Sequence, residues 1–137
     1  MAYWLLKSEP DDWSWDEQVA DGPKGSEWTG VRNNAARRHL SQMAVGDEAF
    51  FYHTGKEKRI VGVAAITRAA YPDPTDETDV WLCVDIAASH PLDRPVTLAE
   101  IKATAALADM ALVKQARLSV QPITPDAWAL ILKMSRT

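Results

Sequence analysis

The chain has 137 residues, of which 47% are apolar and 25% charged, a composition that excludes an intrinsically disordered protein and matches one globular domain over residues 1–137. Its net charge of −4 and pI of about 5.3 exclude a protein that coats nucleic acid through bulk positive charge, so any nucleic-acid site must be local. No apolar run approaches the roughly 20 residues that cross a bilayer, and the first residues lack a secretion signal, so we expect a cytoplasmic protein without membrane contact.

The first half of the chain combines short strands with short helices. Ser14 and Glu17 have the spacing of a capping box, which predicts a helix that ends near Ala20. Asn33 or Asn34 is a suitable N-cap for a second helix, and the segment Ser26–Asn34 before it has no clear period, which is typical of a shaped loop. The other elements expected here are strands over Tyr3–Lys7, Glu48–His53 and Arg59–Tyr71 and the second helix over Ala35–Met43.

The second half opens with a turn at Pro72-Asp73-Pro74. Thr97 and Glu100 form another capping-box pattern ahead of a short helix, and Thr124-Pro125 is an N-cap followed by proline at the first helical position. The elements expected here are strands over Val80–Ala88 and Leu118–Gln121, a short helix to about Ala105 and a C-terminal helix to about Met134.

Strands of mixed length with inserted helices do not fit the strict strand–helix alternation of a doubly wound sheet. The order of elements predicts an α+β fold: a largely antiparallel, curved β-sheet or barrel with inserted helices and a C-terminal helix. Three tryptophans lie in strand-like or helix-like apolar patterns and are expected to be largely buried, namely Trp4, Trp81 and Trp128.

The sequence carries no pattern of a cofactor, a metal site or a catalytic centre. Its glycines have neither the P-loop nor the dinucleotide-binding spacing, and its histidines are scattered without a zinc-binding pattern. The pairs Ser8-Glu9 and Asp11-Asp12 flank Pro10, and their three carboxylates are explained by a turn and the start of a helix. No serine lies in a nucleophile elbow. We therefore predict no cofactor, no metal and no catalytic residues.

Four segments carry a resemblance to a known family: Tyr3–Pro10, Trp28–Asn33, Phe51–Thr54 and Arg117–Val120. In their order and spacing they resemble the signature segments of the EVE domain family, which includes the thymocyte nuclear protein type. The likeness extends over nearly the whole chain. It implies a PUA-like fold, related to the YTH domains that bind a methylated adenine, and it implies binding of modified bases such as modified cytosine in DNA or RNA.

The residues in these segments suit such a pocket, because a flipped base needs an aromatic wall and a few polar groups at its edge. Trp28 and Tyr52 could form the wall, Ser8, Asn33 and His53 could contact the edge, and Gly30 would let the main chain approach closely. The full predicted set is Ser8, Glu9, Trp28, Gly30, Val31, Asn33, Tyr52, His53 and Leu118 for the base, with Arg32 and Arg117 for phosphate.

Other interpretations of these residues stay open at this stage. Arg32 could be a structural ion-pair partner of Glu9, and Tyr52-His53 could simply end a buried strand. The function could also be that of an enzyme acting on a nucleobase or nucleotide, with Glu9 or His53 as acid or base, or of a small-molecule-binding module that shares the fold.

Overall fold

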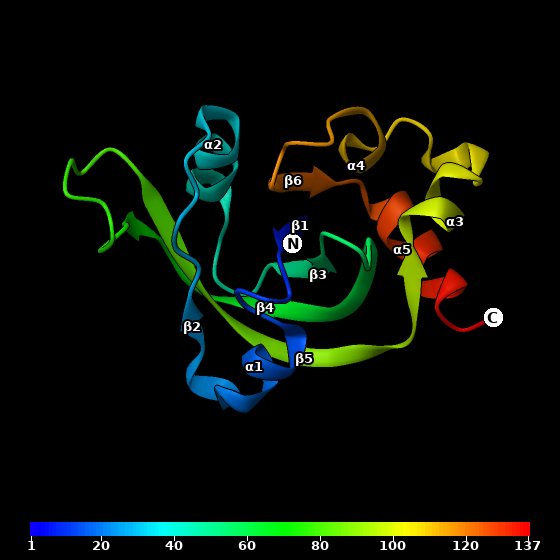
Figure 1. Ribbon diagram of the computed structural model, residues 1–137, viewed down its shortest axis with the longest axis horizontal. Helices are drawn as coiled ribbons and strands as arrows, with labels where there is room; N and C mark the ends of the chain where they lie inside the picture. Colours follow the sequence, from blue (N-terminus) through cyan, green and yellow to red (C-terminus); the bar gives the residue numbers. More distant parts are fainter.

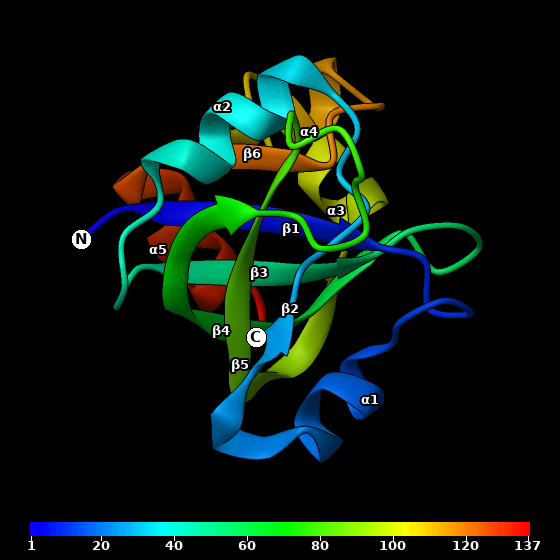
Figure 2. The same ribbon diagram turned by 90° about the vertical axis from the view of Figure 1, so that its left-hand side faces the viewer.

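A six-stranded curved sheet forms the centre of the protein, described over residues 1–137 by a computed structural model (Figure 1). The strands are β1 (Tyr3–Ser8), β2 (Ser26–Glu27), β3 (Glu48–His53), β4 (Arg59–Pro72), β5 (Leu82–Thr97) and β6 (Val120–Ile123). They lie in the order β2-β5-β4-β3-β1-β6, and every neighbouring pair is antiparallel except β1 and β3, which run parallel (Figure 2). The predicted α+β fold with a largely antiparallel curved sheet is confirmed.

The long hairpin of β4 and β5 produces much of the curvature. Its pairing register shifts at four places between Ile60 and Tyr71, and each such irregularity bends and twists the strands. Strand β5 runs nine residues beyond the end expected from the sequence, to Thr97, although it contains Pro91 and Pro95. Because β2 pairs with β5 only at Asp85 and Ile86, the rest of β5 is an edge strand, where proline is tolerated.

Local capping signals set the starts of the main helices. The helices are α1 (Trp15–Ala20), α2 (Asn34–Gln42), α3 (Leu98–Lys102), α4 (Ala111–Lys114) and α5 (Pro125–Met134), with 3₁₀ turns η1 (Gly22–Lys24) and η2 (Ala105–Leu107). Ser14 and Thr97 form the predicted capping boxes, and the side chains of Asn33 and Thr124 cap α2 and α5. None of these helices has the length and apolar character that a membrane-spanning helix requires.

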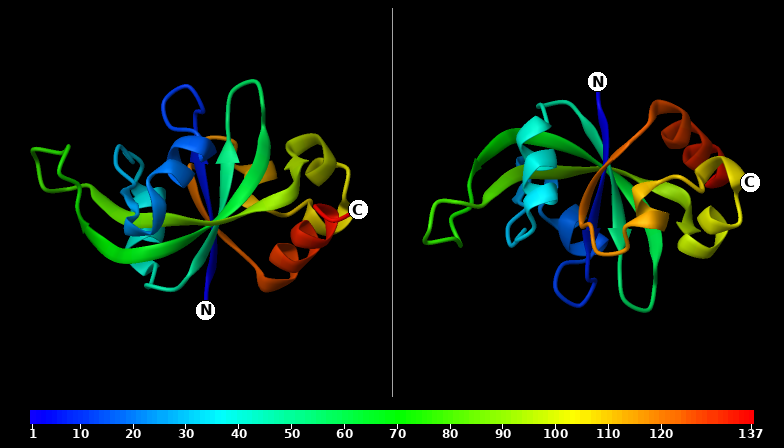
Figure 3. Two further views of the ribbon diagram at one scale, coloured as in Figure 1. Left: turned by 90° about the horizontal axis from the view of Figure 1, so that it is seen from below. Right: turned by 90° about the horizontal axis from the view of Figure 1, so that it is seen from above.

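The sheet separates two apolar cores, with α2 and α5 on opposite sides of the central strands (Figure 3). Successive residues of a strand point to opposite faces, so Leu6 and Phe51 join the α2 side while Leu5 and Phe50 join the α5 side. On the α5 side the ring of Trp128 stacks on Phe50, with 3.8 Å between ring centroids. The candidate site described below lies against the core on the α2 side.

Two of the three tryptophans expected in the core are buried there, and the third is not. Trp4 and Trp128 expose 4% and 5% of their surface. Trp81 instead is partly exposed, because it precedes β5 at the base of the projecting hairpin tip, where the guanidinium groups of Arg32 and Arg37 lie 5.9 and 5.7 Å from its ring centroid.

Gly62 in β4 leaves room for the indole of Trp15, which lies on the sheet at the start of α1. A Cβ at position 62 would come within 2.5 Å of the Trp15 ring. We expect Gly62→Ala to lower the free energy of unfolding by about 1–3 kcal/mol, since overpacking forces neighbouring groups to move. Urea denaturation measures this as a lower midpoint. In a Trp15→Phe background the same substitution should cost less, and an equal cost in both backgrounds would contradict this contact.

Candidate functional site

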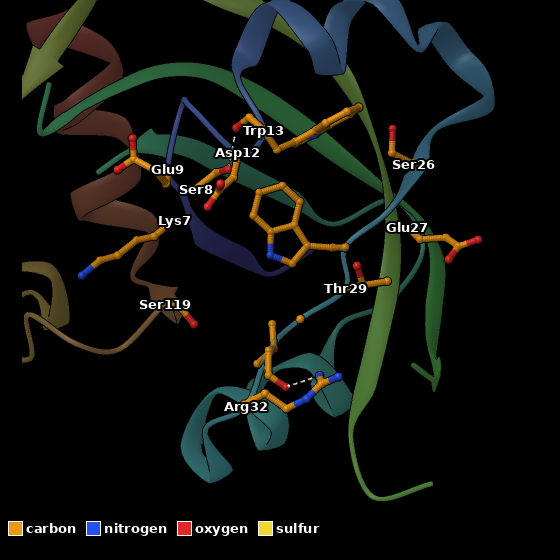
Figure 4. Close-up of a pocket in the computed structure, with 13 residues that line it drawn as sticks. Lys7, Ser8, Glu9, Asp12, Trp13, Ser26, Glu27, Thr29, Arg32 and Ser119 are labelled. Carbon is orange, nitrogen blue, oxygen red and sulfur yellow. Dashed lines mark hydrogen bonds between the residues drawn. The ribbon is translucent and has the colours of Figure 1, made fainter. Parts of the chain in front are cut away.

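A pocket of about 550 Å³ opens where the segment after β1, the segment leading to α2 and the approach to β6 meet (Figure 4). It is lined by residues 7–9, 12–13 and 26–32 and by Ser119. Most of this lining is irregular backbone, so side-chain hydrogen bonds and packing have to fix its shape.

Six of the eleven residues predicted for binding line this pocket, and they come from two of the signature segments. These residues are Ser8, Glu9, Trp28, Gly30, Val31 and Arg32. The structure thus brings together the end of β1 and the segment before α2, as the sequence predicts. The contact of each residue with a base or a phosphate stays a prediction.

The other five predicted residues lie outside the pocket lining. Asn33 is held as the cap of α2, where its side-chain oxygen accepts the Ala36 N–H at 3.0 Å. Tyr52 points into the core on the α5 side, because strand alternation separates it from Phe51. Leu118 is 6% exposed and belongs to the core on the α2 side.

His53 and Arg117 are the remaining two. His53 is buried and both of its ring nitrogens are engaged: Nε2 accepts the Trp15 N–H at 3.0 Å, so the proton lies on Nδ1, 2.8 Å from Glu57. Both nitrogens are therefore used within the protein, and His53 does not line the pocket. Arg117 is exposed and precedes the lining residue Ser119 by two positions in the chain.

The structure adds lining residues that the sequence analysis did not select: Lys7, Asp12, Trp13, Ser26, Glu27, Thr29 and Ser119. Lys7, Thr29 and Ser119 already lie inside the signature segments, and the other four lie within three residues of a segment end, so taking each whole segment with its neighbours would have included them. Trp13 is the most important addition, because it is partly exposed whereas Trp28 exposes only 8% of its surface.

The two indoles are held differently. Trp28 packs edge-on against Phe51, with 5.5 Å between centroids, and forms part of the core as well as the pocket wall. Trp13 donates its indole N–H to the side-chain oxygen of Gln18 at 2.9 Å. Gln18 is fully buried, and its amide in turn donates to Ser26 and to the main chain of Ile86. Trp13 thus has a fixed position at the pocket.

The turn between β1 and α1, residues 9–13, is closed by its own hydrogen bonds. The main-chain oxygen of Glu9 accepts from the N–H groups of Asp12 and Trp13, both at 2.9 Å. The hydroxyl of Ser8 donates to the Trp13 carbonyl at 2.5 Å. The Ser8 proton is committed to this bond, and no histidine lines the pocket to activate the hydroxyl as a nucleophile.

A buried carboxylate, Asp73 at the tip of the β4–β5 hairpin, holds the segment before α2. It is 1% exposed and accepts from the Gly30 N–H at 2.9 Å and from the Arg32 guanidinium at 3.0 Å. Arg32 therefore pairs with Asp73 and not with Glu9. Burial by itself raises the pKa of Asp73, but the hydrogen bonds from Thr75, Gly30 and Arg32 outweigh it and lower the pKa to about 2.

The chemistry of the pocket is that of a binding site with aromatic walls and many acceptors. Three carboxylates, those of Glu9, Asp12 and Glu27, line it together with hydroxyl groups. The structure contains no group of three or more His, Cys, Asp or Glu residues placed to hold a metal ion.

Comparison with known proteins gives consistent matches. The family model described as EVE domain matches residues 2–134. A solved structure from Rhodopseudomonas palustris is 57% identical, with 99% of this chain and 94% of that chain covered and a TM-score of 0.94. Human THYN1, solved in complex with 5-methylcytosine-containing DNA, is 31% identical, with 100% and 99% covered and a TM-score of 0.93.

A more distant likeness concerns the fold alone. The YTH domain of Zygosaccharomyces rouxii MRB1, solved in complex with N6-methyladenosine RNA, is 17% identical, with 98% of this chain and 86% of that chain covered and a TM-score of 0.58. The relation to YTH domains that the sequence resemblance implies is confirmed at the level of fold.

The Asp73 carboxylate makes the free energy of unfolding depend on pH in the acidic range. Its pKa is about 2 when folded against 3.8 in the unfolded chain, so its contribution is present above about pH 4 and is lost as the pH falls toward 2. We expect Asp73→Asn to lower the free energy of unfolding by roughly 1–3 kcal/mol at neutral pH, and this difference should shrink between about pH 4 and 2. Urea titrations over this pH range measure it.

Glu77→Gln, at an exposed position of the same hairpin tip, is the control and should change little at any pH. A difference between the wild type and Asp73→Asn that stayed constant down to about pH 2 would contradict the role of the ionised carboxylate.

Proposed function

This chain belongs to the EVE domain family, and from that premise we propose that it is a binding module that accepts a modified nucleobase of DNA or RNA in the pocket beside Trp13 and Trp28. A base lying in such a pocket must leave the base stack, so the substrate is a single strand or a flipped nucleotide.

One observation carries this proposal: a partly exposed indole stands at a pocket whose remaining lining is rich in hydrogen-bond acceptors. A planar base can stack on Trp13 while its edge meets polar groups. The rigid attachment of Trp13 to Gln18 favours stacking, because little conformational freedom is lost when the base enters. The human relative, solved with 5-methylcytosine-containing DNA, supports the same ligand class.

The acceptors of the pocket favour a base with an exocyclic amino group. Carboxylates accept hydrogen bonds from the N4 amino group of cytosine, and Glu9, Asp12 and Glu27 are the carboxylates present. We propose a modified cytosine in DNA as the first ligand to test, with the same base in RNA as the comparison.

We propose further that the bound base is not turned over. Ser8 has its proton committed to a main-chain carbonyl, and His53 lies outside the pocket with both nitrogens engaged. A nucleobase-acting enzyme would need an activated nucleophile or a water held for attack. A small-molecule-binding module sharing the fold is the other alternative, and a free nucleoside compared with an oligonucleotide tests it.

Replacement of the partly exposed indole should weaken binding. Stacking contributes about 1–3 kcal/mol per base, so Trp13→Ala should weaken binding of an oligonucleotide with one modified cytosine by about tenfold or more. Trp13→Phe should restore most of the affinity, since an aromatic face remains. Fluorescence anisotropy with matched modified and unmodified strands measures both.

Tyr3→Ala is the control, because Tyr3 is also a partly exposed aromatic residue but stacks on Trp128 on the α5 side. It should leave binding unchanged. Trp28→Ala is a poor test by comparison, because loss of a buried indole costs about 3–5 kcal/mol of stability. A folded Trp13→Ala variant with full affinity for the modified strand would show that the base does not stack there.

Long incubation with modified nucleosides, nucleotides and oligonucleotides should leave them intact. Chromatography of the reaction mixture detects free base, a deaminated base or released phosphate. If any of these products appeared with the wild-type protein and not with Glu9→Gln, the protein would be an enzyme and the proposed binding module would be wrong.

A further inference from the structure

The three carboxylates at the pocket are not equivalent. Glu9 and Asp12 belong to the turn after β1, and Glu27 belongs to β2 (Figure 4). A carboxylate can select a group of the ligand only if it faces the pocket and is not already used as an acceptor within the protein. The hydrogen bonds and the strand geometry show which of the three meets both conditions.

The Glu9 carboxylate is used within the protein. Its Oε1 accepts the N–H of Asp11 at 3.3 Å, and its Oε2 accepts the hydroxyl of Thr54 at 3.3 Å. It also lies against the turn between β3 and β4, because a Cβ at Gly55 would come within 2.6 Å of Oε2. Glu9 thus joins the turn after β1 to the turn after β3, and a base that used this carboxylate would compete with that contact.

The Glu27 carboxylate makes no such bonds, but it lies on the wrong face of the sheet. In the pairing of β2 with β5, Glu27 is directly opposite Asp85, so their side chains share a face. The neighbours of Asp85 along β5 are Val84 and Ile86, which both point into the core on the α2 side. Because side chains alternate along a strand, Glu27 points to the opposite face, and Figure 4 shows it directed away from Asp12.

Asp12 meets both conditions. Its main-chain N–H closes the turn by donating to the Glu9 carbonyl at 2.9 Å, which holds the residue next to Trp13. Its side chain is exposed, lines the pocket and makes no hydrogen bond or ion pair within the protein. Figure 4 shows it beside Ser8, on the side of the pocket where Trp13 lies. A base stacked on Trp13 therefore has one free carboxylate near its edge.

On the basis of the proposed function, we infer that Asp12 is the residue that selects a base with an amino group at its edge. The carboxylate accepts a hydrogen bond from the N4 amino group of cytosine. Thymine has a carbonyl oxygen at that position, and two acceptors that face each other repel. Since 5-methylcytosine and thymine have the same methyl group and nearly the same stacking surface, Asp12 distinguishes a methylated cytosine from the product of its deamination.

The test uses single DNA strands in which one 5-methylcytosine or one thymine lies between abasic positions, so that only this base can enter the pocket. Fluorescence anisotropy gives the dissociation constant of each strand. The wild type should bind the 5-methylcytosine strand about tenfold or more tightly than the thymine strand. Asp12→Asn should bring the two affinities within about threefold of each other, since an amide can accept from an amino group or donate to a carbonyl.

Asp11→Asn is the matched control. Asp11 precedes Asp12 in the same turn, is exposed and does not line the pocket. Its replacement removes the same charge and should keep the preference of the wild type. The ratio of the two affinities decides, because loss of a negative charge favours both strands alike, whereas a contact at the base edge changes the ratio. Asp12→Ala has neither carboxylate nor amide and should also lose the preference.

The outcomes separate this inference from the proposed function. Thermal unfolding checks that each variant is folded. Equal binding of both strands by the wild type, or a full preference in Asp12→Asn, would overturn the role of Asp12 and leave base binding intact. The same holds if Glu9→Gln or Glu27→Gln lost the preference while Asp12→Asn kept it. Failure of the wild type to bind any strand with 5-methylcytosine would instead overturn the proposed function.

Discussion

The pocket depends on one buried interaction, the contact of the Asp73 carboxylate with the segment before α2. An ionised carboxylate that is 1% exposed is stable only if donors surround it, and two of those donors are the Gly30 N–H and the Arg32 guanidinium. The hairpin tip and the pocket wall are therefore fixed relative to each other, because separating them would leave a buried charge without partners. Gln18 does the same for the opposite wall, where its fully buried amide is satisfied by Ser26 and Ile86 and its oxygen by Trp13.

Because the pocket lies against one of the two cores, its residues are not equally free to vary. Trp28 belongs to the core on the α2 side, and its contact with Phe51 ties the pocket wall to the centre of the sheet. A change at Trp28 alters stability and binding together. The carboxylates at the opening, those of Glu9, Asp12 and Glu27, are partly or fully exposed, so they can change with little effect on the core. Differences in ligand preference between proteins with this pocket should therefore arise at the opening.

The features that sequence could predict are those held by local interactions. The caps at Ser14, Asn33, Thr97 and Thr124 each bond to the residue three positions further on, so the spacing in the sequence predicts the contact directly. The pairing of Arg32 with Asp73 spans 41 residues, and the sequence suggested only Glu9 as an ion-pair partner of Arg32, because no local spacing links Arg32 to the hairpin tip. Strand alternation does contain the information that Tyr52 and Phe51 face opposite cores, but not which of the two faces holds the pocket.

A net charge of −4 is compatible with the proposed nucleic-acid ligand, because electrostatic interactions are local in salt. At physiological ionic strength charges are screened beyond about 8 Å, so a phosphate at the pocket responds to the nearest side chains and not to the whole protein. Carboxylates at the opening weaken attraction for any strand that offers only phosphates. Under the proposed function, binding then requires the base to enter the pocket, so the stacking and edge contacts decide the affinity. An acidic protein that binds as proposed would therefore discriminate between bases more strictly than a uniformly basic one, because it gains little from the backbone alone.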